Sequence, residues 1–258
     1  IIDNRQKIIN LTKEQIIKIC DRNFIGCDQL ILIGEDKSAD ASLKFFNSDG
    51  GESGACGNGT RCVADLISKE KNNKTIILTT LSGSLKSEIL RNNVVTTEIG
   101  KAKTKWNEIP LSEELNTKNL NIKINDSNNN EHLGGTAVNV GNPHIIFFVK
   151  DCFKIDIKKL GPAIEKHKYF PKRSNVTFAQ VLDKKNIAIN VWERGAGLTK
   201  ACGTAACATA VAAIKKNLAD KNCNIRFKEG DLIINYNNND NIFMTGPVSQ
   251  IEKISIDI

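Results

Sequence analysis

The sequence has no apolar run approaching the ~20 residues that a membrane-spanning helix requires, which excludes an integral membrane protein. Lys and Arg outnumber Asp and Glu by 36 to 29, giving a formal charge of +7. The basic residues are mostly lysines scattered among Asn and Ile, and no nucleic-acid recognition motif accompanies them. We therefore expect neither a membrane nor a nucleic acid as partner. An anionic small substrate is compatible with the charge.

The eight cysteines lack the spacings of the common cysteine motifs. No CxxC redox motif is present, and the spacings Cys56-x5-Cys62 and Cys202-x4-Cys207 fit structural zinc poorly, so we expect no metal site. A disulfide framework belongs to short secreted chains, and no signal peptide is recognisable. We expect reduced thiols and a cytoplasmic protein. Because the sequence starts at Ile1 rather than Met, we also expect its natural N-terminus to be missing.

A chain of 258 residues fits two domains of modest size. Strand-like runs at 75–80, 84–90 and 94–99 are too closely spaced for helical crossovers, so they should pair antiparallel. Residues 100–118 are polar and Lys-rich, typical of a linker or a crossing between domains, and the alternating run 251–258 suggests an edge or closing strand. Helical patterns cover 12–22, 58–69, 156–168 and 203–217, with Gly161-Pro162 expected to break the third.

One cysteine neighbourhood occurs twice. Aligned on Cys56 and Cys202, the two segments share a Gly five residues before, a hydroxyl three before, Ala just before, Gly just after and Ala eight after. Each segment follows a strand-like run and leads into a helix-like one. Two copies of a strand–loop–helix unit, each presenting a thiol, predict a symmetric site with two opposed cysteines.

The position of each thiol at a helix start suggests a chemistry. Unpaired backbone N–H groups and a partial positive charge at a helix N-terminus favour anions. A carboxylate could be held there by Gly57, Asn58, Gly203 and Thr204. The same environment should lower the pKa of the adjacent thiol. A thiolate and a thiol on opposite sides of one carbon can invert a stereocentre, because one removes a proton and the other returns it. We expect no cofactor, since no pyridoxal-lysine or nucleotide-loop motif is recognisable.

Three further residues have both a structural and a functional interpretation. His144, after Asn142-Pro143, is either a turn residue or a partner that exchanges a proton with a thiol. Glu193 and Arg194 are either a solvated ion pair or site residues. They lie nine and eight residues before Cys202, and Asn47 lies nine before Cys56. In a site, Arg194 could bind a carboxylate bidentately, and Glu193 could hold an ammonium group or tune the thiol. The other cysteines are interpreted as core residues.

These residues resemble a known family. The segments 47–50, 55–62, 141–144, 193–204 and 244–247 are similar to those of diaminopimelate epimerases, and the likeness runs along the whole chain. It implies a pyridoxal-independent epimerase that interconverts LL- and meso-diaminopimelate in lysine and peptidoglycan precursor biosynthesis. It also implies a cytoplasmic homodimer. The family opens with a Gly-Asn-Asp-Phe segment, and this sequence starts just after the corresponding point.

The resemblance also implies a fold and a set of site residues. The fold is α+β, with two pseudo-symmetric domains, each a mainly antiparallel, barrel-like sheet around a central helix. We place the first domain at 1–101 with a C-terminal strand at 248–258, and the second at 102–247. Cys56 and Cys202 fall on the acid/base pair, and His144 and Glu193 on thiol-tuning positions. The substrate contacts fall on Gln29, Asn47, Gly57, Asn58, Asn142, Asn175, Glu193, Arg194, Gly203 and Thr204.

Two alternatives stay open. One is a proline-racemase-like enzyme of the same fold, against which Arg194 and the Gly-Asn-Pro-His segment at 141–144 argue. The other is a non-catalytic thiol redox or binding protein that keeps the fold.

Overall fold

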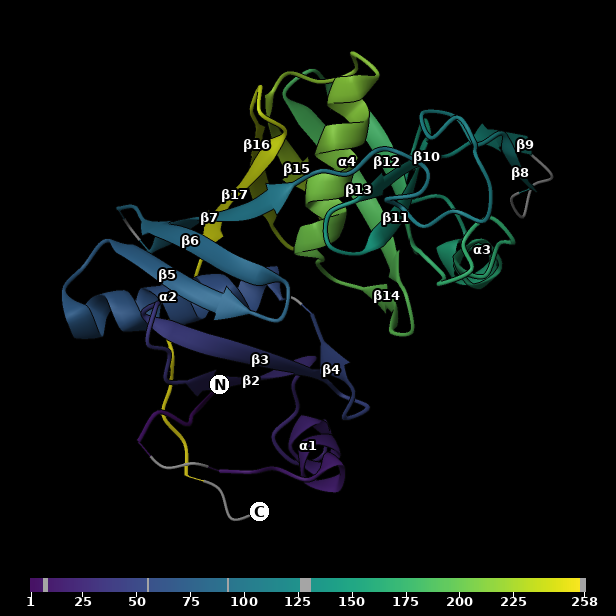
Figure 1. The fold of residues 1–258 in the computed structure, drawn as a ribbon. Coiled ribbons are helices and arrows are strands. Elements are labelled where there is room, and N and C mark those ends of the chain that lie inside the picture. The colour runs from purple at the N-terminus through teal and green to yellow at the C-terminus, as the bar shows by residue number, and fades with distance from the viewer. Residues whose placement is uncertain (7–8, 55, 92, 126–130, 256–258) are drawn as a thin grey trace. The chain divides into compact units, whose positions relative to one another are not determined.

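The computed structural model describes residues 1–6, 9–54, 56–91, 93–125 and 131–255 (Figure 1). Ala55, part of the repeated cysteine motif, lies outside the described residues. The chain forms two compact units. Unit 1 contains Ile1–Glu98 and Gly246–Ile258, and unit 2 contains Ile99–Thr245. The division into independently folding domains at 101/102 and 247/248 stays a prediction.

Unit 1 contains a mixed sheet and two helices. Its strands are ordered β1-β2-β3-β5-β6-β7, with β4 added to β3. The β1–β2 and β3–β5 pairs are parallel, and the other pairs are antiparallel. The antiparallel pairing predicted for β5, β6 and β7 is therefore confirmed. The elements are β1 (Ile2–Asp3), α1 (Lys13–Cys20), β2 (Gln29–Gly34), β3 (Ala41–Asn47), β4 (Glu52–Ser53), α2 (Gly57–Lys71), β5 (Thr75–Thr80), β6 (Gly83–Ile89) and β7 (Val94–Lys101).

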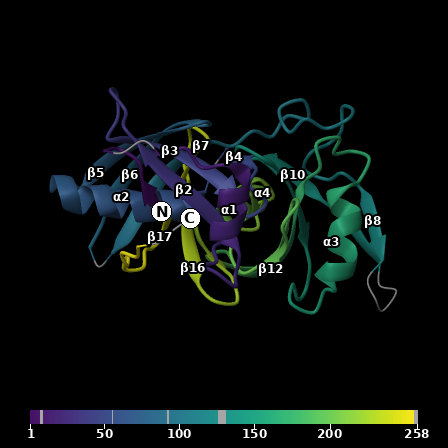
Figure 2. The same ribbon diagram turned by 90° about the horizontal axis from the view of Figure 1, so that it is seen from below.

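The core of unit 1 lies between its sheet and α2. Val63, Ala64 and Ile67 of α2 are fully buried in one cluster with residues of β2, β3, β5 and β7. Helix α1 covers a second, smaller cluster beside β2 (Figure 2). It begins at the predicted capping box, in which Thr12 and Gln15 each accept the other's backbone N–H. The segment that leads into α2, which contains the first cysteine, starts where β3 ends.

Unit 2 contains the sheet β17-β16-β15-β13-β12-β11-β10, with β14 added to β13, and the separate hairpin β8-β9. The β11–β12 and β13–β15 pairs are parallel, and the other described pairs are antiparallel. The elements are β8 (Ile122–Asn125), β9 (Glu131–Gly134), β10 (Thr136–Asn139), β11 (Pro143–Phe148), α3 (Ile157–Glu165), β12 (Asn175–Asp183), β13 (Asn186–Glu193), β14 (Gly197–Thr199), α4 (Gly203–Lys215), β15 (Asn222–Arg226), β16 (Asp231–Tyr236) and β17 (Asn241–Pro247).

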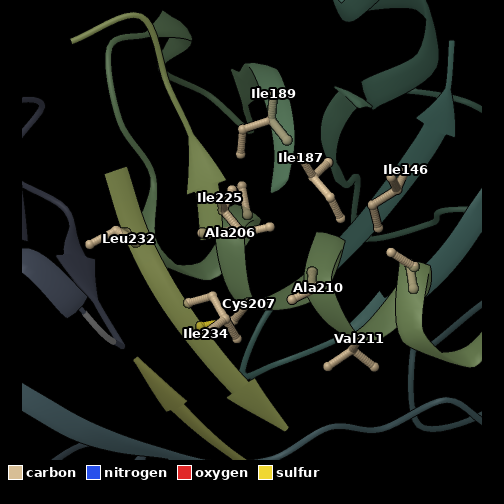
Figure 3. Close-up of a cluster of buried hydrophobic side chains, with 14 of the residues drawn as sticks. Ile146, Ile187, Ile189, Ala206, Cys207, Ala210, Val211, Ile225, Leu232 and Ile234 are labelled. Carbon is tan, nitrogen blue, oxygen red and sulfur yellow. The ribbon is translucent and has the colours of Figure 1, made fainter. Parts of the chain in front are cut away.

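Helix α4 is the centre of unit 2. It packs against β10 at one end of the sheet and against β16, next to the other end, as well as against strands between them, so the sheet curves around it. All of its alanines are buried, and their small side chains let the strands approach closely. Figure 3 shows Ala206, Cys207, Ala210 and Val211 of α4 among isoleucines of the surrounding strands. A separate cluster fills the space between α3 and the other face of the sheet.

The two units repeat the same strand register. Phe45 faces Ser53 between β3 and β4, and Val191 faces Thr199 between β13 and β14. Both pairs shift onto each other by the 146 residues that separate Cys56 from Cys202. The same shift carries the β2–β3 pair Leu30–Phe46 onto the β12–β13 pair Val176–Trp192. The fold is therefore α+β, as predicted, and contains one supersecondary arrangement twice.

Three predictions about the chain path are wrong in whole or in part. Gly161-Pro162 does not break α3, which continues through both residues. Leu160 and Ile164 are buried in the cluster that α3 covers, the α3 cluster, and this burial outweighs the hydrogen bond that Pro162 removes. Residues 100–118 follow directly after the passage from unit 1 to unit 2, but they are not a separate linker, because Ile109 and Leu111 are buried in the α3 cluster.

The C-terminal strand predicted at 248–258 is also absent from the described residues, which have no strand from Val248 to residue 255. The amide of Val248 donates to the carbonyl of Asn93, but Glu252, Lys253 and Ile254 are exposed. Residues 256–258 lie outside the described part.

Candidate active site

The first cysteine caps a helix. Cys56 is the N-cap of α2 with extended backbone angles, φ −143° and ψ 96°, and its Sγ accepts the N–H of Gly59 at 3.4 Å. A Cβ at Gly59 would come within 2.2 Å of Ile31 Cδ1 and 3.1 Å of Cys56 Sγ. A larger residue at position 59 would therefore require the Ile31 side chain to shift. The half-buried Cys56 sulfur lies at a helix N-terminus, as predicted.

Arg61 is a residue that the sequence analysis missed. It is only 4% exposed in α2. Its Nη2 donates to Oδ1 of Asn58 at 3.0 Å, and its Nη1 donates to the carbonyl of Gly57 at 3.4 Å. The guanidinium thus holds the first turn of α2 and orients the Asn58 side chain. The sequence offered one signal for Arg61, which is that it lies five residues after Cys56 in the helix that this cysteine begins.

Gln29 and Asn47 also lie together in unit 1. They face each other across the β2–β3 pair, and Gln29 Nε2 donates to Asn47 Oδ1 at 2.9 Å. Asn47 ends the strand that leads into the first cysteine loop. Two residues that are far apart in sequence are therefore brought together by the strand register alone.

The second cysteine has the same backbone but a different environment. Cys202 is the N-cap of α4, with φ −143° and ψ 109°, and is only 6% exposed. Burial raises the pKa of its thiol well above the usual value, and the charge of the nearby Glu193 carboxylate raises it further. The prediction that a helix start lowers the thiol pKa is therefore wrong for Cys202, because desolvation of the thiolate dominates.

A line of polar contacts leads from Cys202 to His144. Cys202 Sγ lies 3.4 Å from Oγ1 of Thr204, in the first turn of α4. Asn142, in the turn before β11, donates from Nδ2 to that hydroxyl oxygen at 3.5 Å. His144 Nε2 lies 2.8 Å from Asn142 Oδ1. Four of the predicted site residues of unit 2 are therefore in consecutive contact.

His144 is a neutral imidazole in this setting. The side chain is fully buried, which lowers its pKa to about 3, and the charge of Arg194 contributes in the same direction. Its Nδ1 has no hydrogen-bond partner among the described residues. A histidine with this pKa carries no charge at neutral pH, so it acts through its ring nitrogens as one donor and one acceptor.

Asn175 and Arg194 form the adjacent corner of unit 2. The buried Asn175 amide accepts the backbone N–H of Arg194 at 3.0 Å and donates to the carbonyl of Pro143 at 3.0 Å. Arg194 Nη1 in turn donates to the carbonyl of Lys172 at 3.0 Å. Asn175 therefore joins the starts of β11 and β12 to the end of β13, which aligns Glu193 and Arg194.

Each unit therefore gathers its own predicted residues. Unit 1 places Gln29, Asn47, Gly57 and Asn58 around the loop of Cys56, and unit 2 places the other seven around Cys202, Gly203 being its first helical residue. Substrate contacts and catalytic roles remain predictions for all thirteen. Among the described residues, no group of three or more His, Cys, Asp or Glu could hold a metal, and no helix is long and apolar enough to cross a membrane.

Each of these local environments can perform acid–base chemistry. A sulfur atom at a helix start has backbone N–H groups beside it that can bind an anion. In unit 2 it also has a carboxylate that can accept a proton and a hydroxyl that can donate one. Such a set of groups suits proton transfer to and from carbon next to a carboxylate.

Solved structures with this fold are distant in sequence. A protein from Pseudomonas aeruginosa, described as a predicted epimerase, matches with a TM-score of 0.67 at 13% identity, covering 99% of this chain and 92% of that one. A hydroxyproline epimerase from Agrobacterium vitis matches with a TM-score of 0.61 at 14% identity, covering 90% and 77%. These likenesses establish the fold alone.

Sequence comparison is more specific. The family model described as diaminopimelate epimerase matches residues 1–105 and 136–251. A diaminopimelate epimerase from Pelagibacter ubique is 61% identical over 256 residues, covering 99% of this chain and 93% of that protein. One from Acidiphilium cryptum is 37% identical over 258 residues, covering 100% and 91%. With a matching family model over most of its length and relatives this similar, the chain belongs to the diaminopimelate epimerase family.

Proposed function

We propose that this protein is an isomerase that interconverts LL- and meso-diaminopimelate without a cofactor. One observation supports this proposal above the others. In a chain of this family, the same strand–hairpin–helix arrangement occurs twice in one register and puts a cysteine at each helix start. Epimerisation at carbon needs one group that removes a proton and a second that supplies one. A duplicated thiol meets that need.

The proposed reaction uses two bases. The thiolate of one cysteine takes the α-proton from one face of the substrate carbon, and the thiol of the other gives its own proton to the opposite face. The configuration at that carbon inverts, and the two sulfurs exchange protonation states. Negative charge develops on the substrate carboxylate during the step, and N–H groups at a helix start can stabilise it. In the reverse direction the two cysteines exchange roles.

The other site residues fit binding and thiol-tuning roles in this proposal. Gly57, Asn58, Gly203 and Thr204 lie at the two helix starts, where backbone N–H groups suit an α-carboxylate. Arg194 suits the distal carboxylate, and Glu193 suits an ammonium group or the Cys202 proton. The amide side chains of Gln29, Asn47, Asn142 and Asn175 can complete the polar contacts.

The cellular setting is part of the same proposal. Diaminopimelate is a precursor of lysine and of peptidoglycan, so the enzyme would act in those biosynthetic routes. We infer a cytoplasmic homodimer. Sedimentation of the purified protein over a concentration series tests the dimer: a single species at the mass of one 28.4 kDa chain would reject it.

Incubation of LL-diaminopimelate with the protein in deuterated water tests the activity. We expect deuterium at one α-carbon, with the meso isomer accumulating, and no exchange into proline. Exchange into proline instead would support the proline-racemase alternative. Turnover of a dithiol or disulfide substrate, with diaminopimelate unchanged, would support the redox alternative.

Single cysteine variants test the two-base step. Cys56→Ala and Cys202→Ala should each lower kcat by ~10²–10⁴-fold, because each removes one of the two acid–base groups. Cys223→Ala is a matched control, since Cys223 is buried in the core of unit 2 and outside the candidate site. Full activity of either Cys56→Ala or Cys202→Ala would rule out the mechanism.

Oxidation tests whether both sulfurs can reach one carbon. Peroxide should join Cys56 to Cys202 in the substrate-free protein, with loss of activity that a dithiol restores. Peptide mapping can identify the Cys56–Cys202 disulfide, because tryptic peptide 45–61 contains Cys56 as its only cysteine and peptide 201–215 contains Cys202. Activity that survives complete linkage of these peptides through Cys56 and Cys202 would contradict the proposal.

A further inference from the structure

The two duplicated cysteine segments differ in the first turn of the helix. The position two residues after the cysteine is Asn58 in unit 1 and Thr204 in unit 2. Asn58 Oδ1 accepts from Arg61, whereas Thr204 Oγ1 lies 3.4 Å from the Cys202 sulfur. Both the Thr204 hydroxyl and the Cys202 thiol could donate in that contact, so the direction of the hydrogen bond has to be worked out from their neighbours.

The contacts of Asn142 with His144 and Thr204 fix the direction of the hydrogen bonds on one side of Thr204. A carbonyl oxygen only accepts, so the 2.8 Å contact between His144 Nε2 and Asn142 Oδ1 requires the proton to be on Nε2. The other end of the same amide, Nδ2, only donates, and it points at the Thr204 oxygen at 3.5 Å. Thr204 therefore accepts from Asn142, and its single hydroxyl proton is available for another acceptor.

The neighbour on the other side of Thr204 is the Cys202 sulfur, 3.4 Å from Oγ1. A thiolate has no proton and can only accept, so the free Thr204 hydroxyl proton can be donated to it. In the thiolate state the hydrogen bonds therefore run in one direction, from His144 through Asn142 and Thr204 to the sulfur.

We propose that the Thr204 hydroxyl is a dedicated hydrogen-bond donor to the Cys202 thiolate, and that Asn142 and His144 are positioning residues that aim it. In the thiolate the negative sulfur accepts the Thr204 O–H. A hydrogen bond to the charged form favours that form, which opposes the effect of burial.

The catalytic meaning of this arrangement rests on the proposed function, but the arrangement itself does not. The inference gives His144 a role as a fixed N–H donor, rather than as the group that takes a proton from the Cys202 thiol. It also predicts that this hydroxyl donor acts on Cys202 alone, because the residue two positions after Cys56 is Asn58.

The test is the alkylation rate of Cys202 by iodoacetamide in the full chain, measured from pH 7 to 9. Only the thiolate reacts, so the rate reports the thiolate fraction. Mass spectrometry of peptide 201–215 gives the Cys202 rate, with fragmentation separating Cys202 from the buried Cys207, and peptide 45–61 gives the Cys56 rate as an internal reference. We expect Thr204→Val to slow Cys202 about tenfold, equivalent to about one pKa unit, with Cys56 unchanged.

Matched variants separate the hydrogen bond from side-chain shape. Thr204→Ser keeps the hydroxyl and should retain the wild-type rate. His144→Gln can offer an N–H near the Nε2 position and should alkylate faster at Cys202 than His144→Phe, which cannot. Circular dichroism of each variant establishes that it is folded before rates are compared.

The opposite results would overturn the inference. If Thr204→Val alkylates at Cys202 as fast as Thr204→Ser, or faster, the hydroxyl does not stabilise the thiolate, and a reversed Asn142 amide explains the contacts. Absence of Cys202 alkylation in every variant, with Cys56 reacting, also rejects it. Failure of the proposed function is a separate result, since a wild-type protein inactive on diaminopimelate still gives these rates.

Discussion

The indole Nε1 of Trp192 donates to Oε2 of Glu165 at 2.8 Å. Glu165 ends α3 and is only 4% exposed, and Trp192 directly precedes Glu193 and Arg194 on β13. Arg173 Nη1 lies 3.5 Å from the second carboxylate oxygen. This contact ties α3 to the strand end that carries two of the proposed site residues, so the position of that end depends on a helix outside the site.

Loss of the indole donor should destabilise unit 2. In Trp192→Phe the buried Glu165 carboxylate loses a hydrogen bond, which costs about 1–3 kcal/mol in the free energy of unfolding. Glu165→Gln should cost less, because the amide oxygen can still accept from the indole. Urea denaturation followed by circular dichroism measures both. Equal stability of Trp192→Phe and wild type would show that the contact contributes nothing.

The same indole explains Gly161. A Cβ at this position would lie 2.5 Å from Trp192 Cγ and 2.6 Å from Cδ2. Because the large indole ring packs against the helix, it has little room to shift. Gly161→Ala should therefore destabilise by about 1–3 kcal/mol, although alanine is the better helix former. Gly230→Ala is the control, since nothing lies within 4 Å of its Cβ. A Gly161→Ala variant that is no less stable than Gly230→Ala would contradict this packing.

His144 should make stability depend on pH. Its pKa is lowered from 6.5 to about 3 in the folded chain by burial. Between these values the unfolded chain binds more protons, so stability rises with pH, by up to about 1.4 kcal/mol per pH unit from this group, and is lost as pH falls toward 3. The measurement is the urea midpoint at pH 7.5 and pH 4.5. The fall in the urea midpoint from pH 7.5 to pH 4.5 should be smaller in His144→Gln than in wild type. An identical fall in both proteins would exclude His144 as its source.

Mild oxidation should link two cysteines outside the candidate site. Cys27 Sγ lies 3.4 Å from Cys20 Sγ, and the backbone N–H of Cys27 donates to the carbonyl of Cys20 at 3.3 Å. This proximity suits a disulfide. Burial raises the pKa of the Cys20 thiol to about 12, and the Cys27 contact adds to the effect. The reaction with diamide should therefore be slow at neutral pH.

Peptide mapping detects that link as tryptic peptide 19–22 joined to 23–37. Cys27→Ser should abolish it, and Cys152, buried without a neighbouring thiol contact among the described residues, should stay reduced. Linkage of Cys20 to any other cysteine in preference to Cys27 would contradict the geometry. The same map separates this disulfide from one between Cys56 and Cys202.

Local sequence signals were sufficient for much of the fold. The capping box at Thr12 predicted the start of α1, and the short spacings between β5, β6 and β7 predicted antiparallel pairing, because both signals act within a few residues. The duplicated cysteine motif predicted two equivalent helix starts, and the identical strand registers confirm that equivalence.

The errors occur where distant residues decide the outcome. Pro162 stays in a helix because the α3 cluster buries residues on both sides of it. The polar composition of 100–118 is typical of a linker or a crossing between domains, but long-range packing buries Ile109 and Leu111 in that cluster. The terminal alternation predicted a strand that the described residues do not form, since a strand needs a partner edge.

The sequence by itself determined that two cysteines occupy equivalent helix starts, because glycine, a hydroxyl residue and a strand–helix pattern recur at fixed distances from each. Tertiary structure alone decided that these thiols differ. Burial and the Glu193 carboxylate raise the pKa of Cys202, and strands from elsewhere in the chain bring Asn142 and His144 beside it. The physical reason is that a helix start is a local property, whereas desolvation and hydrogen-bond direction depend on every group that folding brings to the sulfur.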